Sequence, residues 1–319
     1  MISQIGNLAS KTFLVTGVNG FLGRAATKYL SALGAYLIGV DTVPVPDCWR
    51  KEDFLGPGTV ERVIGRFEDC TLKLADLLSR RDLTETTVLH FAGLADREEC
   101  EKNIPEAFYI NVHLVWKVAT FCMEYGIPRF IFPSSGYVYS EQLDRPAHEK
   151  DPIIVSNTYV ETKVTAEALL CTLSEAFDLS CIAARLGNVY GSRSRANTVV
   201  GTIIEQLRYG QYPKVRDVTP VRDFIFIEDV IEGCLRLSMC QVNSKYSIVN
   251  LSTGVGMSVG QAVREAAMAF KIEPSGPVNE YGSSQPSYMV LDNTKLLKMT
   301  GWKPEYSFYN GMVKIKEKE

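Results

Sequence analysis

Apolar and polar positions alternate along the first part of the chain in a way that predicts strands and helices in turn. Apolar runs at Phe13–Val15 and Tyr36–Val40 flank a stretch with helical spacing that continues through Leu33. Together they form one βαβ unit. The alternation continues with expected strands at Thr87–Phe91, Phe130–Phe132 and Ser180–Leu186, and expected helices at Pro105–Tyr125 and Thr158–Phe177. It predicts an α/β fold, in which a doubly wound parallel sheet is covered by helices on both faces.

The pattern changes after about residue 187, where the elements become shorter and less regular. Its expected elements are a polar loop at Gly191–Ala196, helices at Val199–Tyr209, Glu228–Cys240 and Ser258–Phe270, and strands at Ile225–Ile227 and Ser247–Asn250. We therefore expect a first domain over residues 1–186 and a smaller C-terminal α/β lobe over residues 187–319. Some of the lobe, at about residues 225–250, is expected to return to the first domain.

Composition and charge exclude several classes of protein. The 319 residues are 46% hydrophobic and 22% charged, with a formal net charge of −3. These values are typical of globular proteins and show no basic excess for nucleic acid. No apolar run reaches 18 residues, and Met1–Ser10 lacks the order of a signal peptide, so neither a membrane partner nor export is expected. The eight cysteines show neither a CxxC pair nor metal-ligand spacing, which indicates reduced thiols, no bound metal and a cytoplasmic protein.

Three glycines between the first strand and the first helix indicate a dinucleotide site. At Gly17, Gly20 and Gly23 the backbone can turn tightly and approach a pyrophosphate, while the helix N-terminus supplies N–H groups and partial positive charge. Asp41 ends the second strand, where a carboxylate accepts hydrogen bonds from ribose hydroxyls and repels a 2′-phosphate. This favours NAD over NADP, although Asp41 could also be a simple turn residue at the strand end.

Tyr159 and Lys163 form a candidate catalytic pair. They are four residues apart in a helical stretch, and this spacing places them on one face of the helix. A lysine ammonium near a phenol stabilises the phenolate and lowers the pKa of the phenol, so that tyrosine can act as a general base. A hydroxyl from Ser134-Ser135, at the end of a strand, could bind the same substrate oxygen. The alternative for the pair is a solvated helix face.

Eight motifs occur in order over Thr12–Tyr306 and resemble those of the extended short-chain dehydrogenase/reductase family. The resemblance is greatest to its nucleotide-diphosphate-sugar epimerases and dehydratases, and His90–Leu94 is similar to the segment in epimerases of the UDP-galactose type. The motifs are Thr16–Gly23 (TGxxGxxG), His90–Leu94, Asn111, Ser134–Ser140, Tyr159 with Lys163 (YxxxK), Arg185–Gly191 (RxxNVYG), Arg222–Asp229, and the set Asp292, Lys295, Gly301, Trp302 and Pro304.

The resemblance implies a Rossmann fold that binds NAD, and it assigns roles to residues of this chain. It implies that Tyr159 is the catalytic base, that Ser135 binds the reacting oxygen and that Lys163 orients the nicotinamide ribose. The implied NAD contacts are Gly17, Asn19, Gly20, Phe21, Leu22, Asp41, Arg66, Phe67, Phe91, Ala92, Gly93, Asn111, Ser134, Tyr159 and Lys163. The implied contacts of a nucleotide-diphosphate sugar are Ser135, Gly136, Asn188 and Arg222. A salt bridge of Arg222 to Asp223 or Asp229 is the alternative.

The sequence departs from the patterns of the family and its members in three places. Arg66 stands where the family usually has an acidic residue against the adenine, so Arg66 could stack on the base or reach a 2′-phosphate. Ser283–Ser287 replaces the late phosphate-binding arginine. Gly136 and Tyr137 replace the Asp-Glu pair of the sugar 4,6-dehydratases, so that 4,6-elimination is not expected.

These resemblances lead us to expect an NAD-dependent nucleotide-sugar epimerase. The hydride passes from C4 of the sugar to NAD, the 4-keto sugar rotates, and the hydride returns to the opposite face. The first alternative is an NDP-4-keto-sugar reductase, or another NDP-sugar oxidoreductase or dehydratase. The second is a non-catalytic NAD-binding regulatory protein. Neither the sugar, its nucleotide nor the stereocentre follows from the sequence.

A homodimer is also expected, because the resemblance implies that two helices pair across subunits. These helices are Ala107–Met123 and Ala166–Phe177. Their expected surface residues include Val112, Val115, Val118 and Phe121. The alternative is that these residues are buried against the chain's own sheet.

Overall fold

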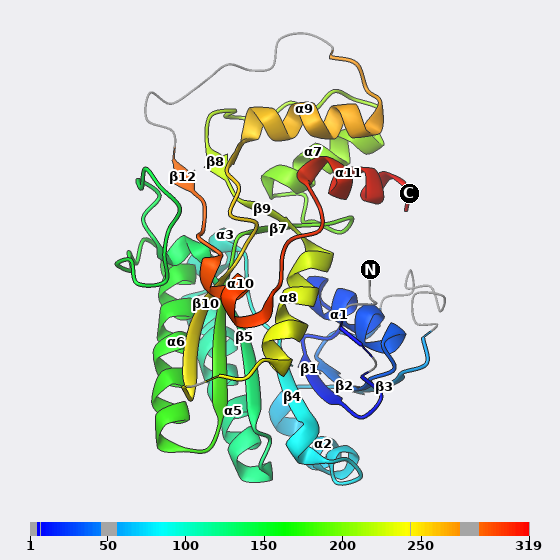
Figure 1. The fold of residues 1–319 in the computed structure, drawn as a ribbon, viewed down its shortest axis with the longest axis vertical. Coiled ribbons are helices and arrows are strands. Elements are labelled where there is room, and N and C mark those ends of the chain that lie inside the picture. The colour runs from blue at the N-terminus through cyan, green and yellow to red at the C-terminus, as the bar shows by residue number, and fades with distance from the viewer. Residues whose placement is uncertain (1–4, 7, 46–55, 243, 275–286, 319) are drawn as a thin grey trace. The chain divides into compact units, whose positions relative to one another are not determined.

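The computed structural model describes residues 5, 6, 8–45, 56–242, 244–274 and 287–318 (Figure 1). Among them, seven strands form one sheet in the order β10-β6-β5-β4-β1-β2-β3. Strand β1 pairs in parallel with β2 and β4, and the pairs β2–β3 and β4–β5 are also parallel. The strands are β1 (Thr12–Thr16), β2 (Tyr36–Asp41), β3 (Thr59–Ile64), β4 (Thr86–His90), β5 (Arg129–Ser135), β6 (Ser180–Leu186) and β10 (Tyr246–Leu251). The predicted doubly wound α/β fold is thus confirmed.

The helices that connect these strands are α1 (Phe21–Ala32), α2 (Phe67–Leu78), α3 (Arg97–Lys102), α4 (Ile104–Phe108), α5 (Leu114–Tyr125) and α6 (Thr158–Ala176). The single helix predicted at Pro105–Tyr125 is divided by a π-helical turn at Tyr109–His113. Pro105 lies in the first turn of α4, where its missing N–H costs no hydrogen bond. The wider π turn carries the polar Asn111 in a buried position.

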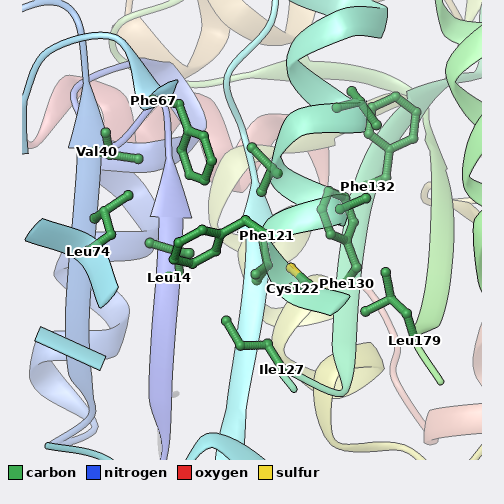
Figure 2. Packing of buried hydrophobic residues seen from close by; sticks show 14 of the residues in the cluster. Leu14, Val40, Phe67, Leu74, Phe121, Cys122, Ile127, Phe130, Phe132 and Leu179 are labelled. Carbon is green, nitrogen blue, oxygen red and sulfur yellow. The ribbon is translucent and has the colours of Figure 1, made fainter. Parts of the chain in front are cut away.

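The main core lies between the sheet and helices α2, α5 and α6. Phe67 of α2 and Phe121 of α5 meet edge to face, with ring centroids 5.4 Å apart, in the same cluster as Leu14 of β1 and Phe130 of β5 (Figure 2). Fully burying one such large apolar side chain contributes about 1.5–3 kcal/mol. This core fixes the strands whose ends carry the candidate site.

The chain divides into two compact units that are made of alternating segments. Unit 1 contains Met1–Val138, Val155–Ala184 and Cys234–Val249, and unit 2 contains Tyr139–Ile154, Arg185–Gly233 and Asn250–Glu319. The predicted boundary between residues 186 and 187 stays a prediction.

Within unit 2, β8 (Val221–Arg222) lies between β11 (Met257–Ser258) and β12 (Tyr288–Met289), and β7 (Asn188–Tyr190) pairs with β9 (Phe224–Phe226). Helix α9 (Val259–Phe270) contacts α7 (Val199–Arg208) and α11 (Phe308–Lys316). Two further helices are α8 (Ile227–Met239), which runs from unit 2 into unit 1, and α10 (Thr294–Thr300).

The predicted dimer surface on the helices within Ala107–Met123 and Ala166–Phe177 differs from the surface that the structure exposes. Val115, Val118 and Phe121 are buried in the core, so the expectation that they serve an exposed surface is wrong. The opposite face of these helices forms a hollow of about 590 Å³, which is lined by Pro105, Phe108, Tyr109, Val112, His113, Trp116 and Leu169. Of the four predicted residues, only Val112 lines this hollow.

Three general features concern the part of the chain that the structure describes. No helix there combines the length and the apolar composition that a membrane crossing requires. No group of three or more His, Cys, Asp or Glu side chains is arranged there to hold a metal ion. The seven described cysteines carry free thiols, and Cys48 lies outside the described residues.

Candidate functional site

The glycine turn between β1 and α1 (Gly17–Gly23), called here the glycine cradle, has no room for side chains at Gly17 and Gly23. Gly17 has φ +66°, and a Cβ there would lie 2.6 Å from the backbone nitrogen of Ala92. A Cβ on Gly23 would overlap the carbonyl oxygen of Gly17. The N–H of Gly17 donates to the carbonyl of Val40, at 2.9 Å, which ties the turn to the end of β2. The turn therefore requires glycine both for its backbone conformation and for its packing.

Helix α1 begins directly after this turn and is suited to an anion. Its N-cap is Gly20, which has no side chain to bond the first N–H groups, and its first turn contains no acidic residue. Phe21 and Leu22 are the first two residues of the helix. The N–H groups of a helix start carry partial positive charge, which favours a pyrophosphate. The residues present thus fit a dinucleotide.

Asp41 ends β2 beside the glycine turn, as predicted. Its Oδ2 accepts a hydrogen bond from the backbone N–H of Asn19, at 2.8 Å, and its Oδ1 accepts one from Val43 N–H, at 2.9 Å. The side chain of Asn19 is buried, and its Nδ2 donates to the carbonyl of Val43. Asp41 therefore does act as a turn residue. Because each carboxylate oxygen accepts more than one hydrogen bond, this role is compatible with binding ribose hydroxyls.

Arg66 and Phe67 lie where α2 begins. Arg66 is the exposed N-cap residue, and its guanidinium carbon is 5.8 Å from the ring centroid of Tyr109. The Tyr109 hydroxyl in turn donates to Glu68, at 2.8 Å. Phe67 points into the core, and its predicted NAD contact stays a prediction.

The segment after β4 packs against the end of β1 and against α6. Phe91 N–H donates to the carbonyl of Thr16, and Ala92 N–H donates to its hydroxyl, at 3.2 Å. A Cβ on Gly93 would lie 3.8 Å from Nζ of Lys163. This segment therefore lies between the glycine turn and the candidate catalytic lysine.

The buried side-chain amide of Asn111 makes its hydrogen bonds to other groups of the protein. Its Oδ1 accepts from the N–H of Leu94, at 2.8 Å, and its Nδ2 donates to the carbonyl of Leu94 and the hydroxyl of Thr162. These bonds hold the strand-end segment against α6. The geometry thus gives Asn111 a structural task, and its predicted NAD contact stays a prediction.

The structure brings Ser135 and Tyr159 together. Ser135 is the last residue of β5, and Tyr159 lies in the first turn of α6, whose N-cap Asn157 accepts from Val160 N–H at 3.1 Å. The Ser135 hydroxyl lies near the Tyr159 phenol and favours its ionised form. Ser135 Oγ also accepts from the N–H of Tyr137, in the buried turn that begins at Gly136.

Burial, and not Lys163, dominates the acidity of Tyr159. Burial raises the pKa of the phenol to about 12, and the nearby hydroxyl of Ser135 opposes this rise. The expectation that Lys163 brings this pKa down is therefore not met. The Lys163 ammonium donates to the carbonyl of Pro133, at 2.9 Å, and lies 5.9 Å from the centroid of the Tyr159 ring. Burial lowers the pKa of Lys163 itself to about 8, against the attraction of Glu167.

The predicted substrate residues Asn188 and Arg222 belong to unit 2. Asn188 begins β7, and its N–H donates to the carbonyl of Asp223, at 2.7 Å. Arg222 pairs with Glu141, with 3.0 Å between Nη2 and Oε2, and Nη2 also donates to the hydroxyl of Ser287. Nη1 donates to the carbonyls of Val221 and Ser287.

The salt bridges considered for Arg222 do not form. Asp223 instead accepts from Thr253 and from Gly254 N–H, and Asp229 accepts from the N–H groups of Glu305 and Tyr306. Of the segment that replaces the late arginine, residues 283–286 lie outside the described residues.

Two carboxylates that contact predicted site residues were not themselves predicted from the sequence. Glu167 is four residues after Lys163 and accepts a hydrogen bond from the hydroxyl of Ser134, at 2.5 Å. Its spacing was a usable signal, since residues four apart share a helix face. Glu141 lies 81 residues from Arg222, and no local pattern connects the two.

Comparison with known proteins identifies relatives over nearly the whole chain. The model of the NAD dependent epimerase/dehydratase family matches residues 13–252. UDP-glucose 4-epimerase of Lacticaseibacillus casei is 24% identical over 315 residues, which cover 92% of each chain. dTDP-D-glucose 4,6-dehydratase of Mus musculus is 27% identical over 237 residues, which cover 72% of this chain and 66% of the mouse protein. The structure of UDP-glucose 4-epimerase from Thermus thermophilus in complex with NAD has a TM-score of 0.78 and 24% identity, covering 95% of this chain and 96% of that one.

The family match covers more than half of the chain and includes the parts of the site in unit 1. The glycine cradle, the uncapped start of α1 and the carboxylate of Asp41 fit NAD, the cofactor that the family's description names. The fold, this fit and the matched residues agree: the chain belongs to the NAD-dependent epimerase/dehydratase family.

Proposed function

We propose that this protein is an NAD-dependent epimerase that inverts C4 of a nucleotide-diphosphate sugar. The observation that carries the proposal is the juxtaposition of the Ser135 and Tyr159 hydroxyls, where β5 ends. Two hydroxyls that meet in this way can bind one sugar oxygen between them. The names of relatives such as UDP-glucose 4-epimerase support a nucleotide sugar as the substrate.

In this mechanism, Ser135 holds the C4 oxygen and Tyr159 exchanges its proton. Tyr159 accepts the C4 hydroxyl proton as the sugar is oxidised, and returns it when the keto sugar is reduced. When bound, NAD supplies the hydride acceptor and a cationic ring that favours the phenolate. Lys163, whose ammonium donates to the Pro133 carbonyl, would also donate hydrogen bonds to the cofactor's ribose.

The experiment that tests this function is turnover of candidate sugar nucleotides without added reductant. Purified protein is incubated with UDP-glucose, UDP-galactose, UDP-N-acetylglucosamine or dTDP-glucose, and the products are identified by ¹H NMR of the anomeric protons. An epimerase interconverts a pair of 4-epimers without net consumption of NADH. A reductase instead consumes NADH or NADPH in proportion to product, and a dehydratase forms a 4-keto-6-deoxy sugar. Consumption of NADH or NADPH in proportion to product, or formation of a 4-keto-6-deoxy sugar, would contradict the proposal.

The pairing of Arg222 with Glu141 predicts the effect of one substitution on nucleotide binding. If Arg222 binds the diphosphate, this anion must compete with the Glu141 carboxylate for the same guanidinium. Glu141→Gln removes the competing charge, so we expect the Kd for UDP to fall about five- to tenfold in isothermal titration calorimetry. Glu205→Gln, which changes an exposed glutamate of α7, is the matched control and should leave the Kd unchanged. An equal or higher Kd for Glu141→Gln would argue against a diphosphate at Arg222.

We also propose that two copies of the chain pair through the hollow beside α5. Its lining is apolar, and the Trp116 side chain there is 39% exposed. The resemblance to the family implies pairing of these helices, and a second copy brings a surface of the same composition. Trp116→Glu buries a charge in that interface, and we expect it to convert a dimer into a monomer in light scattering coupled to gel filtration. Leu72→Glu, on exposed α2, should not change the mass; a monomeric native protein would rule out the pairing.

A further inference from the structure

Strand β5 and helix α6 are joined by three successive contacts at the candidate catalytic site. The carbonyl of Pro133 accepts from Lys163, the hydroxyl of Ser134 donates to Glu167, and the side chain of Ser135 lies beside Tyr159. The three helix residues are spaced four apart and therefore share one helix face. Two of these contacts involve residues with assigned roles in the proposed reaction. The third joins Ser134 to Glu167, and Glu167 has no assigned role.

Glu167 is a carboxylate without access to bulk water. Its exposed fraction is 4%, and that of Ser134 is 3%. A buried carboxylate loses its hydration and needs hydrogen-bond donors or a nearby cation to remain charged. Ser134 supplies a donor at 2.5 Å, and Lys163, one turn earlier in α6, supplies the positive charge.

The other titratable groups that face Lys163 do not carry a negative charge at neutral pH. His90 on β4 is buried, which lowers its pKa to about 3, so it is neutral. Burial raises the pKa of Cys100 on α3 and that of Tyr159 on α6, so both are protonated. Among these facing groups, Glu167 therefore contributes most to stabilising the charged ammonium of Lys163.

We propose that Glu167 is a positioning residue, which keeps Lys163 charged and, through Ser134, holds the end of β5 in place beside Tyr159. This inference rests on the proposed function, because it assigns Glu167 a task in the same proton transfer. Without the carboxylate, Lys163 loses its proton at a lower pH, and its ammonium is no longer available to hold the cofactor's ribose. The hydroxyl of Ser135, next to Ser134, would also lose part of its support.

The test is Glu167→Gln, which keeps an oxygen acceptor for Ser134 and removes only the charge. We expect the pKa of Lys163 to fall from about 8 to about 7, since removing an opposite charge disfavours the ammonium. Well below pH 7 the lysine is charged in both proteins, whereas between about pH 7 and pH 8 it stays mostly charged only in the native protein. The alkaline limb of the kcat profile should therefore move to lower pH, with a loss of kcat of about fivefold at pH 8 that approaches tenfold above about pH 9.

The ionisation of Lys163 can be measured without any substrate, which separates this inference from the proposed function. In ¹³C-lysine-labelled protein, the resonance that disappears in Lys163→Met is followed by NMR against pH. If the native protein converts no sugar nucleotide, the proposed function is wrong, but the titration of Lys163 still tests the role of Glu167. If Glu167→Gln leaves the titration of Lys163 unchanged, the assignment of Glu167 is overturned.

Two further variants guard against a general effect of mutating this helix. Glu161→Gln changes an exposed glutamate of α6 two residues before Lys163, and should leave both the titration and the profile unchanged. Glu167→Asp retains the charge and should restore most of the native titration even where the glutamine variant folds poorly. A titration in Glu167→Asp as low as in Glu167→Gln would contradict a role for the charge.

Discussion

Replacement of Tyr159 by phenylalanine is expected to lower kcat by about 10³-fold and to leave NAD bound. The substitution removes the one hydroxyl that both contacts Ser135 and can exchange a proton with the sugar, and positioned proton transfer contributes roughly 10²–10⁴-fold to a rate. The ring still packs against Leu94, Cys100 and Ala107, so the fold should persist. The measurements are kcat and KM for the best sugar nucleotide, together with the NAD content of the purified variant.

A second tyrosine serves as the control for this loss. Tyr125→Phe removes a hydroxyl from α5, at the edge of the main core and outside the candidate site, and should keep native turnover. If Tyr159→Phe also turns over at a near-native rate, another group must transfer the proton and the proposed mechanism fails.

Gly17→Ala is expected to abolish NAD binding, with an increase in Kd of at least about 100-fold. Two effects combine at this position. At φ +66° an L-residue costs about 1–2 kcal/mol, and the new Cβ would lie 2.6 Å from the backbone of Ala92. The glycine turn must therefore move away from β4, and the N–H groups at the start of α1 lose the position that suits a pyrophosphate.

Gly126 provides a matched comparison, because it isolates the first of these two effects. It has φ +70° as the C-cap of α5, but a Cβ there meets no described atom within 4 Å. Gly126→Ala should lower the free energy of unfolding by about 1–2 kcal/mol and leave the Kd for NAD unchanged. Calorimetric titration with NAD and thermal unfolding of both variants give the two quantities. Tight NAD binding by Gly17→Ala would show that the cofactor does not lie against this turn.

Local patterns in the sequence predicted the features that depend on local structure. The apolar run at Phe13–Val15 and the glycines after it correspond to β1 and the turn before α1, since strand burial and backbone freedom are properties of short segments. The four-residue spacing of Tyr159 and Lys163 correctly placed both on α6, because that spacing matches the helical turn.

Features that depend on the tertiary surroundings of a residue could not be predicted from local sequence patterns. Helix α5 is apolar on two faces, so periodicity alone did not show that Val118 is buried and Trp116 is exposed. The pKa of Tyr159 follows from how deeply the phenol is buried, which is a tertiary property. The partner of Arg222 comes from a segment 81 residues away.

The order of strands in the sheet has a consequence for any attempt to shorten this protein. In the sheet, β6 lies between β5 and β10, and β10 follows β6 only after about 60 further residues that include α7 and α8. A truncated gene product that stops at residue 186 would lack β10, and one side of β6 would be left with unpaired backbone N–H and carbonyl groups. Such an open edge recruits strands from other molecules, so the isolated N-terminal fragment should precipitate, whereas a circularly permuted chain that retains β10 keeps the edge covered.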